Sequence, residues 1–427
     1  MTNFDVIEAY TEDFTKWAYR NYRGTAKITN NTIVITNVVE TNNIVEDDNE
    51  PYSDLTIRVT GVTENKHLIV RQGRGKPETH IKKDGVYTFK DNNLYFGFGV
   101  SVIGECNITI TQLPTSILKD FSGNRHDAYL YGFKGRLNSG VGIYKIDFSK
   151  TLNLSAFDNF ERLNNKVIAK GNYSGNWNVF GEYDINGIVK NKVTIKITGL
   201  NNIKEKLSLE YGYYTTDSKY IKNIILIDKD GIYTYDLNDI IIPDESNIAH
   251  TIYNRMYFGE QIINDINLIV EEIPDYSNQL CYDGKSYGVA YDMPILTDYT
   301  IIADRTWFNI RGISCFIGKR NESGDNLGAF EFEFRANRTF SFGGNNVIIF
   351  ADNNIVYQTK NSYNGTEIKP GSLDDTDVLI IGAAQRNVNN KIQDPYIGCH
   401  GNILLFNRSL TEYEISWVKN NMMCSKQ

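Results

Sequence analysis

Two closely spaced glutamates are the first residues of this sequence that could do chemistry together. Glu331 and Glu333 lie in the segment AFEFEF, where alternating apolar residues predict a β-strand. Side chains two residues apart on a strand share one face about 7 Å apart, a separation that two-carboxylate hydrolysis of a glycoside could use. The E-x-D-x-x-E spacing of one hydrolase class is absent, however, and two solvated glutamates on a polar strand face explain the pattern better. We assign no catalytic residue and expect that the protein is not an enzyme.

The histidines and cysteines form no catalytic or metal-binding motif in the sequence. The five histidines are scattered, and no HExxH, GxSxG or GxxxxGK[ST] motif occurs. The five cysteines contain no CxxC pair, which favours buried free thiols over a disulfide framework or a zinc site. We expect no cofactor and no metal, with bound calcium as an open alternative. The oxygen donors for calcium would be aspartates near predicted loops that lack the spacing of a calcium-binding loop, namely Asp283, Asp292, Asp374 and Asp375.

A group of aromatic residues is the best candidate for ligand binding. The apolar face of a sugar ring packs on an aromatic ring, so clustered aromatic side chains are typical glycan platforms. The candidates are four tyrosines, which we expect in a longer loop, and an upstream tryptophan: Trp177, Tyr211, Tyr213, Tyr214 and Tyr220. Tyrosine also fills the edges of β-sandwiches, so a structural role is the alternative. Two further tryptophans, Trp307 and Trp417, are expected in a hydrophobic core.

The region that contains these tyrosines is a near-copy of the N-terminal region. Four segments match in the same order, which indicates an internal duplication. They pair residues 10–17 with 144–151, 55–62 with 193–200, 82–89 with 228–235, and 107–114 with 267–274. The alternation of apolar and polar residues in LTIRVTGV and VTIKITGL predicts strands, and a DG pair before each aromatic strand predicts a hairpin. Each copy is therefore predicted to be an antiparallel β-sandwich of about 100 residues.

The remaining sequence is predicted to form a third β-module that the second sandwich interrupts. Strand-like segments precede residue 144 and continue after residue 275. Only the segment after Ser409 has a helical pattern, with Thr411 as the N-cap and Ile415, Trp417 and Val418 as its apolar face. We expect an arm (residues 1–9), sandwich module 1 (10–115), a first jelly-roll segment (116–143), an inserted sandwich module 2 (144–274) and the main jelly-roll segment (275–427).

The bulk composition argues against several classes of protein. The chain has 427 residues, a formal net charge of −8 and a hydrophobic content of 41%, which suits several compact units with their own cores. Basic residues form no stripe, so we expect no nucleic-acid binding. No run of about 18 apolar residues occurs, so we expect no membrane insertion. The start, MTNFDVIEAY, lacks the apolar core of a signal peptide, which indicates synthesis in a cytoplasm.

The C-terminal segment carries a recurrent family motif. Its positions are Gly401, Ile403, Phe406, Arg408, Leu410, Thr411, Glu414 and Ile415. This pattern resembles the closing strand and short helix of laminin G-like, concanavalin A-like jelly rolls. Residues 120–133 and 280–308 resemble earlier strands of the same family, although the match departs at Cys281, Tyr282, Ser286 and Tyr287. Together with the duplicated sandwiches, the resemblance predicts an all-β fold: two related small antiparallel β-sandwich modules and a discontinuous concanavalin A-like jelly roll with a short C-terminal helix.

Several longer phrases resemble a narrower group of proteins. DFSGN (residues 120–124), GRLNSGVGIY (135–144) and YQTKNSYNG (357–365) resemble segments of virion structural proteins of tailed phages that infect gut Bacteroides, the crAss-like group. The resemblance implies a virion location after synthesis in the host cytoplasm, other virion proteins as partners, and a symmetric homo-oligomer. It also implies a head or tail fibre or decoration whose lectin-like domain binds a host-surface glycan. Two alternatives stay open: a purely structural particle component without a ligand, and a glycoside-active jelly-roll enzyme.

Overall fold

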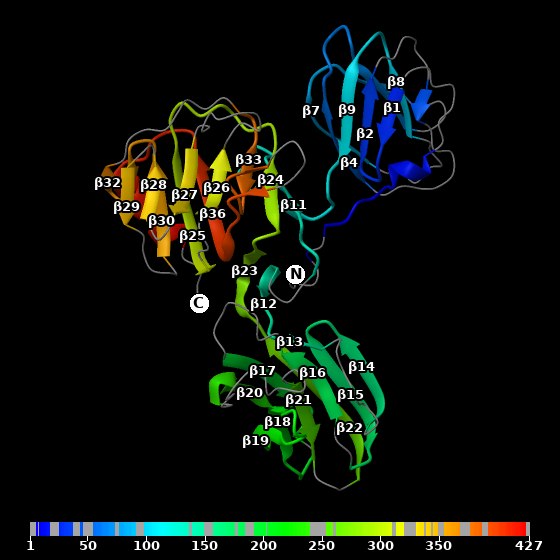
Figure 1. Cartoon of the computed structure of the whole chain (residues 1–427), viewed down its shortest axis with the longest axis vertical. Coiled ribbons are helices and arrows are strands. Elements are labelled where there is room, and N and C mark those ends of the chain that lie inside the picture. The colour runs from blue at the N-terminus through cyan, green and yellow to red at the C-terminus, as the bar shows by residue number, and fades with distance from the viewer. Residues whose placement is uncertain are drawn as a thin grey trace.

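The part of the chain that the structure describes is mostly antiparallel β-sheet. The computed structural model describes residues 6, 8–17, 25–36, 43–45, 54–72, 77–90, 98–135, 139–148, 157–175, 178–183, 192–201, 203–239, 253–258, 262–309, 313–319, 330–336, 339–342, 345–348, 354–367, 376–386 and 392–423. Within these ranges a single α-helix lies near the C-terminus, which confirms the predicted all-β fold class. No helix in the described ranges is long and apolar enough to cross a membrane. Figure 1 shows three β-lobes connected by short segments.

The N-terminal lobe is a sandwich of two antiparallel sheets. The first sheet has the order β1 (Thr25–Ile28), β2 (Thr32–Thr36), β9 (Asn107–Gln112), β4 (Leu55–Thr60) and β7 (Gly85–Phe89). The second has the order β3 (Asn43–Val45), β8 (Phe98–Val102), β5 (Leu68–Gln72) and β6 (Glu78–Ile81). Alternate residues of these strands form the core, and a 3-10 helix (Phe14–Lys16) contributes Phe14 and the adjacent Trp17 to it.

The second sandwich repeats this strand order. Its first sheet has the order β14 (Phe157–Leu163), β15 (Lys166–Tyr173), β22 (Ile263–Ile273), β17 (Lys192–Thr198) and β20 (Gly231–Asp236), the last followed by a 3-10 helix (Leu237–Asp239). Its second sheet has the order β13 (Ile146–Asp147), β16 (Asn178–Tyr183), β21 (Tyr253–Tyr257), β18 (Leu207–Tyr214) and β19 (Tyr220–Ile227). The likeness extends to single contacts, because the aspartate of each DG pair accepts a backbone hydrogen bond at the equivalent position. Asp84 accepts from Val62 N at 2.9 Å, and Asp230 accepts from Leu200 N at 2.7 Å.

The third lobe is built from two larger sheets. One has the order β10 (Ile117–Leu118), β11 (Ala128–Tyr131), β24 (Tyr287–Ala290), β33 (Leu379–Ile381), β26 (Ile313–Lys319), β27 (Phe330–Ala336), β28 (Thr339–Phe342) and β29 (Asn345–Ile348). The other has the order β12 (Gly140–Ile143), β23 (Asp275–Asp283), β36 (Ile397–Phe406), β25 (Thr300–Asn309), β30 (Asn354–Thr359), β31 (Ser362–Tyr363) and β32 (Thr366–Glu367). A small pair, β34 (Gln385–Arg386) and β35 (Ile392–Gln393), completes it. Trp307 is buried in this lobe, as predicted.

Strands from before and after the inserted sandwich pair with each other in the third lobe. Tyr129 of β11 lies opposite Val289 of β24, and Gly140 of β12 lies opposite Cys281 of β23. This pairing is the one that a jelly roll split by an insertion requires. The module boundaries themselves stay a prediction.

A polar joint fixes the two ends of the inserted sandwich side by side. The buried Glu272 accepts hydrogen bonds from the backbone amides of Lys145 and Ile146, at 2.8 and 2.9 Å. The Lys145 ammonium forms an ion pair with Asp275 at 2.8 Å. Lys145 and Ile146 follow the jelly-roll strand β12, Glu272 lies near the end of β22, and Asp275 begins the jelly-roll strand β23, so the chain leaves and rejoins the jelly roll at one place. Adjacent ends are the geometry at which a domain insertion is tolerated.

The N-terminal arm is attached to the jelly roll. Val6 is buried in the jelly-roll core, and its carbonyl oxygen accepts a hydrogen bond from Gly135 N. Glu8 N donates to Phe133 O at 2.6 Å, and the Glu8 carboxylate accepts from Gly132 N. The arm therefore attaches to the jelly roll, which is the lobe that also contains the C-terminal helix.

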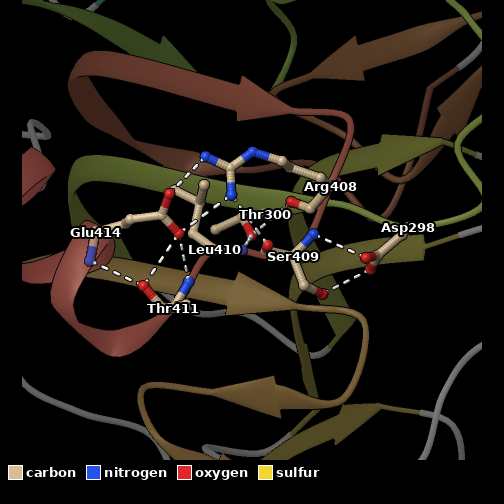
Figure 2. Close-up of polar contacts among 7 residues, drawn as sticks. All are labelled: Asp298, Thr300, Arg408, Ser409, Leu410, Thr411 and Glu414. Carbon is tan, nitrogen blue, oxygen red and sulfur yellow. Dashed lines mark hydrogen bonds and ion pairs between the residues drawn. The ribbon is translucent and has the colours of Figure 1, made fainter.

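Contacts within the C-terminal motif hold the helix α1 (Glu412–Asn421) against the jelly roll, as Figure 2 shows. The Thr411 hydroxyl accepts from Glu414 N, and the Glu414 side chain accepts from Thr411 N, which is a complete capping box. The Arg408 guanidinium contacts both carboxylate oxygens of Glu414 and helps to hold its pKa at about 2. Asp298 accepts from the backbone and hydroxyl of Ser409. These motif residues have structural roles.

One part of the helix prediction is wrong. Ile415 and Val418 are buried, as expected, but Trp417 is 51% exposed. Consecutive helical residues are about 100° apart around the axis, so Trp417 lies off the stripe that Ile415 and Val418 present to the sheet. Trp417 therefore does not belong to the core.

Replacing Thr411 with alanine is expected to lower the free energy of unfolding by about 1 kcal/mol, because Glu414 N loses its acceptor. Thr411→Ser keeps the hydroxyl and should stay within a few tenths of a kcal/mol of the parent. Urea denaturation curves of the two variants measure this difference. Equal losses in both variants would instead assign the effect to the threonine methyl group.

Candidate functional site

The predicted aromatic candidates lie on strands, which corrects their expected loop placement. Tyr211, Tyr213 and Tyr214 lie in β18, and Tyr220 begins the neighbouring β19. The alternation in LSLEYGYY was the missed signal, because it directs Leu207, Leu209, Tyr211 and Tyr213 to one face of a strand. Trp177 lies outside the described residues.

Tyr211 and Tyr213 are core residues and do not offer a binding surface. Their exposed fractions are 3% and 1%, and both belong to the hydrophobic core of the inserted sandwich. The Tyr211 ring packs against Tyr235 of the opposite sheet at 4.7 Å between centroids. Burial raises the pKa of Tyr211. The prediction that these two tyrosines bind a glycan is therefore wrong for the folded chain, because a sugar cannot reach their rings.

Tyr214 and Tyr220 lie together on the outer face of the same sheet. They are directly opposite each other across β18 and β19, both half-buried, with ring centroids 4.8 Å apart. Arg255 reaches them from β21, on the other side of β18. Its guanidinium lies 4.1 Å from the Tyr220 ring centroid, and its Nη2 donates to the Tyr214 hydroxyl at 2.7 Å. We call Tyr214, Tyr220 and Arg255 the tyrosine–arginine cluster.

A cation over an aromatic ring and a guanidinium hydrogen bond both restrict the motion of these side chains. Three neighbouring strands position the tyrosine–arginine cluster, so it rests on a rigid sheet rather than on a loop. The cluster thus combines ring surface with fixed hydrogen-bonding groups. This combination of an apolar ring and polar groups suits a ligand rich in hydroxyl groups.

A buried carboxylate, a lysine and a buried strand glycine adjoin the cluster. Glu210 shares the outer face of β18 with Tyr214, lies opposite Arg255 in the strand register, and forms an ion pair with Lys222. Gly212 lies between Glu210 and Tyr214 on this face, and a Cβ there would lie 2.1 Å from the Ile221 carbonyl oxygen. A glycine inside a strand allows another backbone to approach closely, and here the approaching backbone is that of Ile221 in β19. Glu210 is only 2% exposed and Gly212 is buried, so of these three neighbours only the Lys222 ammonium group is open to a ligand beside the two rings.

Arg255 could not be found from the sequence. It lies far along the chain from both tyrosines and has no motif around it. Only the strand order β21-β18-β19 brings it to the cluster. Glu210 and Lys222 could have been found from the register of a predicted hairpin, because their strands are consecutive.

The carboxylates considered for hydrolysis or calcium do not form a site in the described residues. Glu331 and Glu333 flank the buried Phe332 in β27, and their side chains lie outside the described part. Asp283 accepts from Lys285 N and Ser286 N in a turn, and Asp292 accepts from Val86 N of the N-terminal sandwich. Asp374 and Asp375 fall outside the described residues. Among those described, no three histidine, cysteine or acidic side chains could hold a metal ion together.

The jelly-roll core contains a buried histidine that has a structural role. His400 is fully buried, and its ring stacks on Tyr282 at 5.5 Å between centroids. The Tyr282 hydroxyl lies 3.0 Å from Nε2, and Nδ1 lies 2.8 Å from Gly401 O, so Nδ1–H donates and Nε2 accepts in the neutral ring. Burial lowers the pKa of His400 to about 4 and raises that of Tyr282. Both groups stay uncharged at neutral pH.

Comparison with known proteins gives little further guidance. No family model matches the sequence, and no curated protein matches it significantly. A tandem CBM22-1–CBM22-2 domain of Paenibacillus barcinonensis Xyn10C is similar at 10% identity and a TM-score of 0.21, over 63% of this chain and 96% of that one. The Trypanosoma rangeli sialidase in complex with sialic acid is similar at 11% identity and a TM-score of 0.25, over 93% and 83%. Similarity at this level assigns no function.

Proposed function

We propose that the protein is a non-catalytic structural component of a tailed-phage virion that binds a host-surface glycan through its inserted sandwich. The observation that carries the glycan-binding part is the tyrosine–arginine cluster on the outer face of β18, β19 and β21. Its half-buried rings offer stacking surface for a pyranose, and Arg255 and Lys222 supply groups that bind hydroxyls. The virion part rests on the phrases DFSGN, GRLNSGVGIY and YQTKNSYNG, which resemble segments of tailed-phage virion proteins.

The arrangement of the lobes supports a role in presentation. The inserted sandwich forms a separate lobe in Figure 1, and the polar joint of Lys145, Glu272 and Asp275 attaches it to the jelly roll. A rigidly attached lobe can extend a binding surface away from the part of the chain that contacts the particle. We propose other virion proteins as partners of the jelly roll or the N-terminal sandwich, in a symmetric homo-oligomer on the head or tail.

Tyr220→Ala is expected to weaken glycan binding about fivefold or more, because stacking on a ring is worth roughly 1 kcal/mol or more. The measurement is a glycan array, followed by titration of the best ligand with the full chain. Tyr413→Ala is the matched control, since Tyr413 is a 79% exposed tyrosine on α1, far from the cluster in sequence and on another lobe.

Two outcomes would contradict the proposed function. A parent chain that binds no glycan would favour a purely structural particle component. Cleavage of an array glycan that disappears in Glu331→Gln would favour the glycoside-active enzyme, because Glu331 is one of the two carboxylates spaced for hydrolysis.

A further inference from the structure

Two cysteines of the jelly roll face each other across neighbouring strands. The register of β23 and β36 places Cys281 directly opposite Cys399, and their side chains contact each other. Both thiols point to the same residue: Cys281 Sγ donates to the Gln279 carbonyl oxygen, and Cys399 Sγ donates to Gln279 Oε1. Both cysteines are fully buried in one small cluster with Ile143.

The spacing of directly opposed residues in an antiparallel sheet matches the spacing that a disulfide needs. Opposed Cα atoms are about 4.5 or 5.5 Å apart, and a disulfide spans roughly 4.4–6.8 Å between Cα atoms. A bond between Cys281 and Cys399 therefore requires no displacement of β23 or β36. Sequence spacing could not reveal this pair, because the jelly-roll strands from β24 to β35 lie between the two residues.

The other described cysteines do not compete for this bond. Cys106 belongs to the core of the N-terminal sandwich, and Cys315 donates to Ile317 O in β26 of the other jelly-roll sheet. All four cysteines in the described ranges are buried free thiols, as predicted. Cys424 lies outside the described residues, so the test also looks for a disulfide bond between Cys424 and either cysteine of the pair.

We propose that Cys281 and Cys399 are a covalent modification site, at which a small-molecule disulfide converts the two thiols into one cross-strand disulfide. One cysteine thiolate attacks a sulfur of oxidised glutathione and releases one glutathione thiolate. The second cysteine thiolate then attacks the resulting mixed disulfide and releases the other glutathione. Two protein thiols are oxidised, one glutathione disulfide is reduced, and the two protons lost by the cysteines pass to the two glutathione thiolates. This inference is independent of the proposed glycan binding.

The rate of this reaction should depend on whether the chain is folded. The thiolate is the reacting species, and burial raises the pKa of Cys399, so the folded chain keeps few reactive thiolates. During folding, both cysteines are exposed until β36 pairs with β23. The disulfide should therefore form rapidly when the chain refolds in oxidised glutathione and slowly when the folded chain is exposed to it. Once formed, it closes the long loop between residues 281 and 399 and restricts the unfolded chain.

The test refolds the full chain with oxidised or reduced glutathione, unfolds the product in guanidinium chloride while iodoacetamide blocks the remaining thiols, and maps the peptides by mass spectrometry. The expected product joins Cys281 to Cys399 and raises the jelly-roll Tm by roughly 10 °C. Cys281→Ser should abolish this rise and leave Cys399 alkylated, whereas Cys106→Ser should keep it. Complete alkylation of both cysteines, or a bond from either one to Cys106, Cys315 or Cys424, would overturn the proposal. The peptide map of the parent chain decides this even if a variant fails to fold.

Discussion

Gly199→Ala should unfold the inserted sandwich, with a loss of more than about 4 kcal/mol. Gly199 has a φ of +103°, and a Cβ at this position would lie 1.9 Å from the carbonyl oxygen of Asn267. Real Cβ atoms do not approach a carbonyl oxygen so closely, and Asn267 belongs to β22, the central strand that pairs with β17. Relief of the clash would require separation of these strands. The backbone strain at a positive φ adds about 1–3 kcal/mol to this cost.

Two other glycines test this explanation: one at the equivalent position of the N-terminal sandwich, and one where a Cβ would meet no other atom. Gly61 is the equivalent position of the N-terminal sandwich, with a φ of +86° and Asn107 O 2.0 Å from where a Cβ would lie, so Gly61→Ala should unfold that module. Gly104 has a φ of +77°, but a Cβ there would meet no atom within 4 Å, so Gly104→Ala should cost only about 1 kcal/mol. Guanidinium denaturation and hydrogen exchange of β17 and β22 measure the effects. Equal losses for Gly199→Ala and Gly104→Ala would show that strain alone is responsible.

The jelly roll is expected to lose about 3 kcal/mol of stability as the pH falls from 6.5 to 4. Burial lowers the pKa of His400 from 6.5 to about 4, and one pKa unit corresponds to about 1.36 kcal/mol. The unfolded chain therefore binds a proton at a higher pH than the folded chain does. The stabilisation is complete above pH 6.5, declines as the pH falls, and is lost below pH 4. Once Nε2 is protonated, it can no longer accept the hydrogen bond from the Tyr282 hydroxyl.

The pH effect can be separated from the general effect of acid on the protein. Unfolding free energies of the parent and His400→Asn should be compared between pH 7 and pH 4. The variant is expected to be less stable at pH 7, because a buried ring is lost, but to have a much shallower pH dependence. His80→Asn serves as the control, since His80 is exposed on the N-terminal sandwich. An unchanged slope in His400→Asn would rule out His400 as the titrating group.

The repeat could be predicted from the sequence because its geometry depends on a few residue types. Both sandwiches share turns that require a glycine, at positions 61 and 199, and an aspartate, at positions 84 and 230. Side-chain environment was harder to predict. Alternation divides β18 into two faces, but the assignment of Tyr213 to the core and of Tyr214 to the outer face requires knowledge of where the opposite sheet lies. The position of Arg255 beside Tyr220 depends on strand order, which no local pattern encodes.

The joint at Lys145, Glu272 and Asp275 has a mechanical consequence. The inserted lobe is tethered by two covalent connections that leave the jelly roll side by side, as β12 and β23. A pulling force on a bound lobe is therefore shared between two polypeptide segments in parallel. A protease that cuts one of these segments leaves the lobe attached through the other.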